Sequence, residues 1–263
     1  MRLNIKNASV WVLAGWMAFW AFGCARRSDD HDVLFQTSTI FALMEGAYDG
    51  EMTIGELKRR GDTGLGTFNA LNGEMVVMDG VVYRVAADGK VAVVGDSART
   101  PFAAVTFFEA DRTARPKGPT DFRKLTEAID AILPTKNIPY AVRIAGEFSY
   151  VRTRSVPAQR RPYPRLVEVV KNQPTFEFRN VRGDIVGFRL PGYVKGVNVP
   201  GYHLHFLTDD KTAGGHVLDL VAEEVKIEID SCSAIHAAMP QTADFAAADL
   251  SRQSAEELEK VEK

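Results

Sequence analysis

Three of the chain's five histidines, His203, His205 and His216, fall within one short segment. Residues 202–207 alternate with the period of a β-strand, residues 208–212 have the composition of a turn, and a second apolar run follows. This pattern predicts a β-hairpin that carries all three imidazoles.

Side chains two residues apart in a strand share a face, so His203 and His205 are expected to point the same way. A turn centred between Asp210 and Lys211 places His216 opposite His205, with about 5 Å between their Cβ atoms. Three imidazole nitrogens can hold a divalent ion and leave one coordination position open, as in catalytic zinc sites. The hairpin therefore predicts a Zn²⁺ site. The plainer alternative is an ordinary hairpin whose histidines are satisfied or exposed.

The composition is that of a globular protein. Of the residues, 46% are hydrophobic and 25% are charged. With 263 residues, the chain is long enough for one large domain or two smaller ones with a substantial core. The net charge is −2, and lysine and arginine do not cluster with aromatic residues. Nucleic acid is therefore not an expected partner.

The N-terminus has the layout of a secretory signal. Arg2 and Lys6 precede an apolar run that is short for a membrane span, and the run ends in Ala-Phe-Gly-Cys at Cys24. Residues 1–23 are therefore predicted to be a signal peptide of the lipoprotein type. The alternatives are an ordinary cleaved signal or an uncleaved anchor.

On this interpretation the protein is exported and anchored in the bacterial envelope or periplasm by a lipid on Cys24, its only contact with a membrane. Residues 24–32 are polar and would form a tether, and His31 within it is not expected to bind metal. Cys232 is the other cysteine, so lipidation of Cys24 would leave no intramolecular disulfide.

The remaining sequence predicts an α/β fold of the α+β-like kind, with two domains built on mixed β-sheets. Residues 33–134 are assigned to an N-terminal β-rich domain, in which Asp79-Gly80 and Asp88-Gly89 are strong hairpin signals. Residues 135–263 are assigned to a C-terminal zinc-binding domain that carries the histidine hairpin.

Several segments have clear element patterns. Thr53 and Glu56 have the spacing of a capping box, which begins a helix expected to continue to Arg60. Residues 138–156 form a long strand pattern that bends near Gly146. Shorter strands are expected at 175–178, 184–190 and 225–230, and further helices at 120–133, 166–172 and 251–262.

Separate stretches of the chain, in the same order, resemble the acetolactate decarboxylase family, and the similarity runs from about residue 33 to the C-terminus. The stretches are 35–39, 48–57, 64–69, 71–75, Thr-Arg-Ser-Val-Pro at 153–157, 180–183, and the Tyr-His-Leu-His-Phe and Gly-Gly-His motifs at 202–206 and 214–216.

The resemblance implies the decarboxylation of 2-acetolactate to acetoin and carbon dioxide, through an enediolate stabilised by zinc. His203, His205 and His216 would be the zinc ligands. The small-molecule substrate would be the main partner, and a homodimer is implied by the family alone.

The resemblance also assigns further site residues. Arg154, Glu74 and Glu262 would be catalytic, and Thr67 and Arg154 would bind substrate. The family has threonine where this chain has Ser155. Without the resemblance, the arginine and both glutamates would be interpreted as exposed residues and the threonine as a packing residue.

These residue types suit the reaction. The guanidinium of Arg154 can bind both oxygens of a carboxylate. The enediolate must be protonated on one face, and a metal-bound water, Arg154 or a glutamate could supply the proton. The sequence does not choose among these donors, and it does not define the acetoin enantiomer.

The same three histidines would also fit two other classes of protein. A secreted zinc hydrolase would need a glutamate as general base and would not need Arg154. A metal-binding or sensor lipoprotein without enzymatic activity would close its site with a fourth protein ligand.

Overall fold

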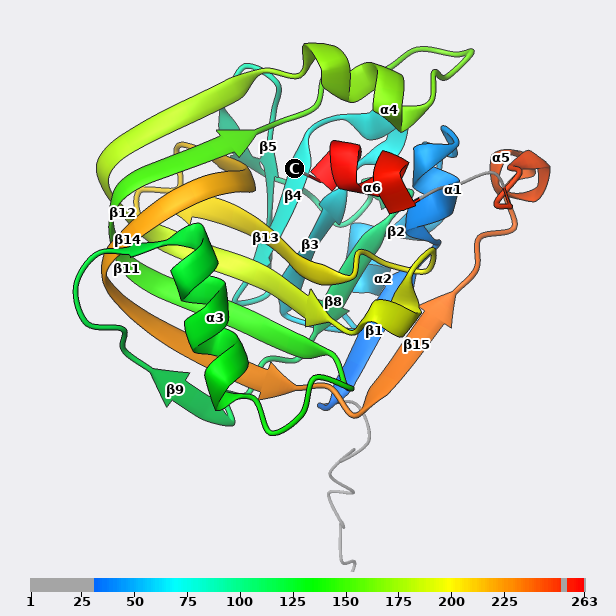
Figure 1. The fold of residues 1–263 in the computed structure, drawn as a ribbon. Helices are drawn as coiled ribbons and strands as arrows, with labels where there is room; N and C mark the ends of the chain where they lie inside the picture. The colour runs from blue at the N-terminus through cyan, green and yellow to red at the C-terminus, as the bar shows by residue number, and fades with distance from the viewer. Residues whose placement is uncertain (1–30, 252–254, 263) are drawn as a thin grey trace, which may run out of the picture.

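Two β-sheets form most of the molecule (Figure 1). The computed structural model describes residues 31–251 and 255–262, so the expected signal peptide, Cys24 and most of the expected tether lie outside the described residues. None of the helices in the described ranges has the length and apolar character needed to cross a bilayer.

The first sheet has seven strands in the order β15-β1-β8-β3-β4-β5-β6. The turn between β4 and β5 is Asp79-Gly80, and both residues have positive φ angles, of 50° and 75°. This conformation matches the hairpin signal in the sequence. The bounds are β1 Val33–Thr37, β3 Thr63–Thr67, β4 Glu74–Met78, β5 Val81–Val85, β6 Val91–Val93, β8 Ala103–Thr106 and β15 Ala234–Ala238.

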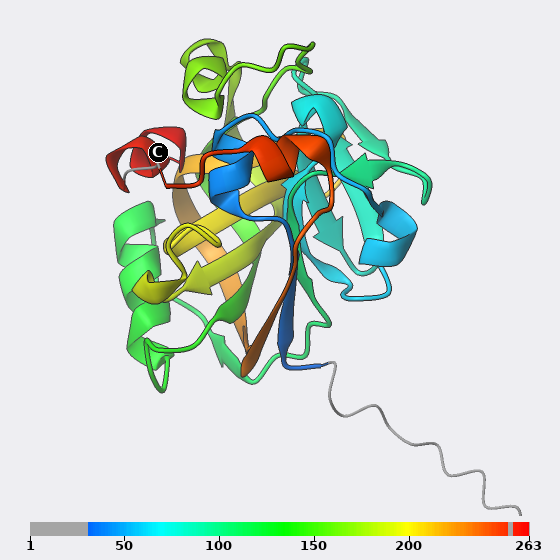
Figure 2. The ribbon, with the colours of Figure 1, turned by 90° about the vertical axis from the view of Figure 1, so that its right-hand side faces the viewer.

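The edge strand β15 comes from the C-terminal part of the chain and runs parallel to β1 (Figure 2). This strand was not predicted from the sequence, and it lies within the segment assigned to a second domain. The division into 33–134 and 135–263 stays a prediction.

The second sheet is closed on itself. β14, β11, β12 and β13 pair in succession, and β13 also pairs with β14, so these four strands form a ring around an apolar core. Two short strands, β9 and β10, add to β14. The bounds are β9 Arg112–Ala114, β10 Thr120–Asp121, β11 Tyr140–Arg154, β12 Thr175–Leu190, β13 Gly201–Thr208 and β14 Gly214–Ser231.

The strands of this second sheet are longer than the sequence predicted. The segments 175–178 and 184–190 belong to the single strand β12, and 225–230 is the end of β14. The polar stretch inside β12 resembles a turn, but it lies on the exposed half of the strand, where polar side chains are stable. The long strand β11 was predicted, and its pairing with β14 shifts register after Glu147, close to Gly146.

The helices are short and lie around the sheets. Thr53 and Glu56 form the predicted capping box, but the helix ends at Leu57 rather than Arg60. The bounds are α1 Ile40–Met44, α2 Ile54–Leu57, α3 Phe122–Ile132, α4 Leu166–Val169, α5 Ala243–Ala247 and α6 Ala255–Glu262, with 3-10 turns at Asn69–Leu71, Val170–Asn172 and Gly192–Val194 and a small ladder of β2 Met52–Thr53 with β7 Arg99–Thr100.

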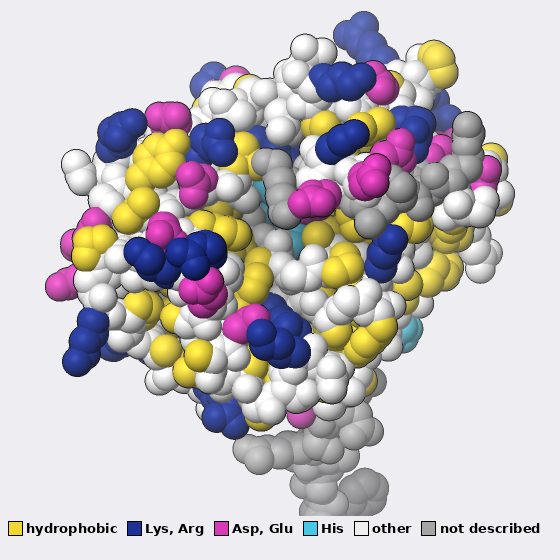
Figure 3. Space-filling model, in the orientation of Figure 1, with side chains coloured by type: hydrophobic (Ala, Val, Ile, Leu, Met, Phe, Trp, Pro, Cys, Tyr) yellow, Lys and Arg dark blue, Asp and Glu magenta, His cyan; other side chains and the backbone are white. Residues whose placement is uncertain are grey.

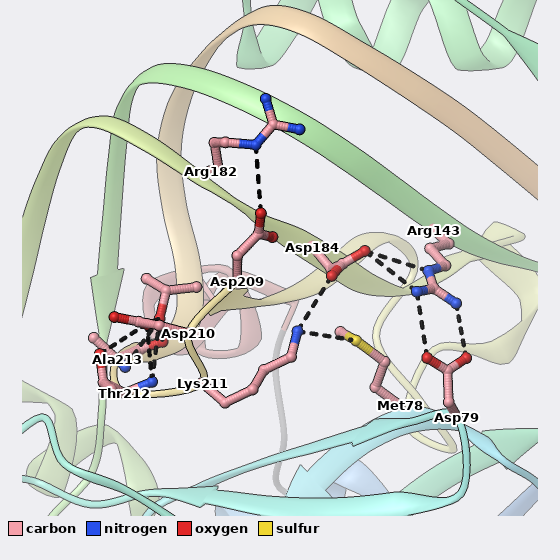
Figure 4. Close-up of polar contacts among 11 residues, drawn as sticks. Met78, Asp79, Arg143, Arg182, Asp184, Asp209, Asp210, Lys211, Thr212 and Ala213 are labelled. Atoms are coloured by element: carbon pink, nitrogen blue, oxygen red, sulfur yellow. Dashed lines mark hydrogen bonds and ion pairs between the residues drawn. The ribbon is translucent and has the colours of Figure 1, made fainter.

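A network of charged side chains joins the two sheets away from the histidines (Figure 4). Arg143 of β11 contacts Asp79 in the β4–β5 turn at 2.8 Å and Asp184 of β12 at 3.4 Å. Lys211, in the β13–β14 turn, contacts Asp184 at 3.3 Å. The network therefore fixes the first sheet against two strands and one turn of the second.

Candidate active site

The three histidines lie together in the second sheet. His205 of β13 is paired with His216 of β14, and His216 is paired on its other side with Arg154 of β11. His203 lies two residues before His205, and the centroids of the three rings are 5.0 to 5.3 Å apart. Among the described residues, these histidines form the one group whose ligand atoms, all within 4.8 Å of one another, could hold a metal ion.

Hydrogen bonds to backbone carbonyl groups fix two of the imidazole tautomers. His205 Nδ1 donates to the carbonyl oxygen of Met75 at 2.7 Å, and His216 Nε2 donates to that of Glu262 at 3.1 Å. The opposite nitrogens, His205 Nε2 and His216 Nδ1, are buried without a hydrogen-bond partner, and so is His203 Nδ1. A buried nitrogen without a partner is costly unless something binds it, so these atoms fit a metal ion.

Burial keeps these imidazoles neutral. Desolvation lowers the pKa of His203 to about 3 and the pKa of His205 and His216 well below the usual value, and the charge of Arg154 adds to the effect. Neutral imidazole is the form that binds a metal, so no proton has to leave these side chains near pH 7.

Two buried carboxylates face the histidines from different parts of the chain. Glu74, at the start of β4, places Oε2 3.6 Å from His205 Nε2. Glu262, at the end of α6, places Oε2 3.6 Å from His203 Nε2 and 3.9 Å from His216 Nε2. Burial raises the pKa of each carboxyl group to about 7, against the opposing effect of Arg154. Both groups can therefore gain or lose a proton near neutral pH.

Arg154 is buried at the end of β11, in contrast to the exposure that its arginine-rich surroundings would suggest. Its Nη1 donates to Oε1 of Gln173 at 3.0 Å and lies 3.6 Å from Oε1 of Glu74. Its Nε is buried and has no partner among the described residues. The guanidinium therefore retains a donor for an anionic group in the site.

Thr67 ends β3 beside Glu74, its partner in the β3–β4 ladder. Its hydroxyl donates to the carbonyl oxygen of Gly73 at 2.8 Å, so toward the cavity the oxygen can only accept a hydrogen bond.

One cavity collects the predicted residues. Thr67, Glu74, Arg154, His203, His216 and Glu262 all line it, while His205 lies beside Glu74. Histidine side chains are visible at the bottom of a hollow near the centre of one face (Figure 3). Apolar side chains that the sequence analysis did not single out complete the lining, namely Ile40, Leu43, Leu71, Phe102, Val156 and Leu166.

Gln173 was not predicted as a site residue, although it contacts Arg154 from 19 residues away. No spacing signal connects this residue to β11. The other two histidines lie outside the group, which was expected of His31. His31 is exposed, and His236 lies in β15 with its ring against Phe35.

Known proteins match this chain over most of its length. The family model described as alpha-acetolactate decarboxylase matches residues 34–252. The alpha-acetolactate decarboxylase of Methanosarcina mazei is 50% identical over 232 residues, which cover 88% of this chain and 81% of the relative. The protein of that name from Bacillus subtilis is 42% identical over 217 residues, which cover 82% and 85%.

The fold agrees with these matches. The crystal structure of alpha-acetolactate decarboxylase from Bacillus subtilis strain 168 superposes with a TM-score of 0.86 at 41% identity, covering 88% of this chain and 99% of that one. The span matched by the family model ends before Glu262, and the structure places the Glu262 carboxylate 3.6 Å from His203 Nε2. Sequence and fold together show that the chain belongs to the alpha-acetolactate decarboxylase family.

Proposed function

We propose that the protein decarboxylates 2-acetolactate to acetoin and carbon dioxide, using Zn²⁺ held by His203, His205 and His216. The observation that carries this proposal is the set of three buried, neutral imidazoles whose unpartnered nitrogens lie beside an arginine and two carboxylates. Family membership supports the same substrate.

The donor set fits an open zinc site. Three neutral nitrogens are typical catalytic ligands, and among the described residues the group holds no fourth member. A bound zinc ion would act as a Lewis acid that stabilises negative charge on the substrate oxygens when carbon dioxide leaves. The binding-protein alternative would require a fourth protein ligand, and the comparisons do not support the secreted hydrolase.

Arg154 would bind the carboxylate of 2-acetolactate. Its buried Nε has no partner, and the nearest acceptor of its Nη1 is the neutral amide of Gln173. A fixed cation of this kind would hold the substrate so that its carboxylate lies in a defined direction relative to the histidines.

Glu74 and Glu262 would hold and move protons. Loss of carbon dioxide leaves an electron pair on the substrate as an enediolate, which needs one proton to become acetoin. With a pKa of about 7, each of these carboxyl groups can be protonated at neutral pH and donate to the substrate. Thr67 would accept a hydrogen bond from the substrate hydroxyl, because its own proton is held by Gly73.

The test is acetoin formation from racemic 2-acetolactate by protein that lacks residues 1–24. Chelation should abolish acetoin formation, and zinc should restore it with one ion bound per chain. A folded, zinc-loaded protein that forms no acetoin would contradict the proposal.

A matched pair of histidine variants makes this test specific. His216→Gln removes one of the three proposed ligands and should prevent stoichiometric zinc binding. His236→Gln changes a histidine outside the group and should leave both zinc content and activity intact.

We also propose export and lipid attachment at Cys24. Fractionation of cells that produce the full chain should find it in the membrane fraction, and Cys24→Ser should release it. A soluble wild-type protein that keeps residues 1–23 would contradict this proposal. The homodimer implied by the family stays a prediction, which the mass in solution would test.

A further inference from the structure

Helix α6 carries Glu262 into the active site, where His216 Nε2 donates to the backbone carbonyl oxygen of Glu262 at 3.1 Å. Its eight residues are too short to form a stable helix in isolation. Its buried apolar side chains are Leu258 and Val261, which lie in an apolar cluster that includes Leu166 and Val169 of α4. Apolar contacts are not directional, so they do not by themselves determine how far along its axis this short helix lies.

Arg165 supplies a directional contact. It precedes α4 and donates from Nη1 and Nη2 to both carboxylate oxygens of Glu257 in α6, at 3.3 and 2.9 Å. Its Nε donates to Oε1 of Glu45, the residue that ends α1, at 3.0 Å. One guanidinium therefore joins α6 to α1 and α4, both of which contribute apolar residues to the wall of the active-site cavity.

We propose that Arg165 is a positioning residue, which fixes α6 so that the Glu262 carboxylate reaches His203 and His216. This inference rests on the proposed role of Glu262. A shift of one residue along a helix moves a side chain by about 1.5 Å and turns it by about 100°. A misplacement of about 1 Å at a reacting group can cost about 100-fold in rate. The two parallel hydrogen bonds to Glu257 oppose both movements.

The decisive variant is Arg165→Met, which keeps a long apolar side chain and removes both contacts. Hydrogen–deuterium exchange of peptides covering 255–262 should become at least tenfold faster in the zinc-loaded protein, while β13 and β14 should be unaffected. We expect kcat to fall at least fivefold and KM to change less than twofold, because Arg154 still binds the substrate carboxylate. Arg165→Lys should give an intermediate result, since an ammonium group cannot form the two parallel bonds.

Arg161→Met is the matched control. Arg161 also joins two carboxylates, those of Asp49 and Asp244, but Asp244 belongs to α5 rather than α6. This variant should leave the exchange of 255–262 and the value of kcat unchanged. The double variant Arg165→Met with Glu257→Gln should be no more impaired than Arg165→Met alone, if Arg165 acts through Glu257.

The exchange measurement does not depend on catalysis, so it separates this inference from the proposed function. Unchanged exchange of 255–262 in Arg165→Met would overturn the inference, and so would faster exchange with an unchanged kcat. An equal loss of kcat in Arg161→Met would also overturn it. Glu262→Gln should lose activity while α6 stays protected, and a fully active Glu262→Gln would overturn the role of Glu262 rather than the contact that holds the helix.

Discussion

The Nδ1 atom of His205 lies 2.7 Å from the carbonyl oxygen of Met75, across the boundary between the two sheets. Met75 belongs to β4 of the first sheet and His205 to β13 of the second. This hydrogen bond directs the free Nε2 of His205 toward the site. Glu74 precedes Met75, so the same strand of the first sheet supplies both a backbone partner and a carboxylate to the histidines of the second.

Glu74→Gln tests the proton-transfer role. The amide keeps the shape of the side chain but cannot donate and recover a proton, so kcat should fall by about 100-fold or more. Zinc content should not change, because Glu74 is not a member of the histidine group. Steady-state kinetics and metal analysis on the same sample check this prediction, and a variant with wild-type kcat would exclude Glu74 as an essential proton donor.

Gln173→Glu tests whether the charge of Arg154 must remain available to the substrate. A carboxylate in place of the neutral amide would form a charge-assisted hydrogen bond to Nη1 and compete with the substrate carboxylate. We expect KM for 2-acetolactate to rise about tenfold or more, with a smaller change in kcat. Gln173→Met removes the orienting contact without adding charge and should raise KM less. An equal KM in the two variants would argue against competition.

The network at Arg143 should contribute stability rather than activity. Arg143→Met removes contacts to Asp79 and Asp184 from a half-buried position, which should cost about 1–3 kcal/mol. Thermal unfolding should therefore begin at a lower temperature, with kcat unchanged. Arg182→Met is the control, because Arg182 pairs with Glu147 and Asp209 at an exposed position and should have little effect on Tm.

Asp230 should make stability depend on pH. Burial raises the pKa of its carboxyl group to about 7, while the backbone N–H of Glu109 partly offsets this by donating to it at 3.2 Å. Because its pKa is raised in the folded state, this carboxyl group contributes most to the free energy of unfolding below about pH 4. This contribution is lost as the pH rises through about 7. Asp230→Asn keeps a neutral acceptor, so its Tm relative to wild type should increase between pH 4 and pH 8. A difference in Tm that does not vary with pH would contradict this prediction.

The hairpin shows how much local sequence can determine. Alternation and turn composition between His203 and His216 were enough to pair His205 with His216, because the side-chain period of a strand and the length of a turn together define register. The family resemblance then supplied Arg154, Glu74, Glu262 and Thr67. All of these residues lie at the site.

Contacts between distant segments could not be predicted from the local sequence in the same way. Gln173 contacts Arg154 because β11 and β12 are neighbours, and the polar half of β12 had suggested two strands instead of one. The edge strand β15 is short and partly exposed, so it has little apolar alternation to reveal it. These features depend on tertiary pairing rather than on local propensity.

The bond between Met75 and His205 spans 130 residues of sequence, and β1 pairs with β15 across an even longer interval. Structures dominated by such distant contacts fold slowly, because long loops must close before their contacts can form. A nascent chain that has been synthesised only as far as β8 has Glu74 but none of the three histidines, and it still lacks β15, the edge strand of the first sheet. Capture of the proposed zinc ion would therefore be a late event in folding, and the time course of zinc uptake during refolding would report when the last strands have closed.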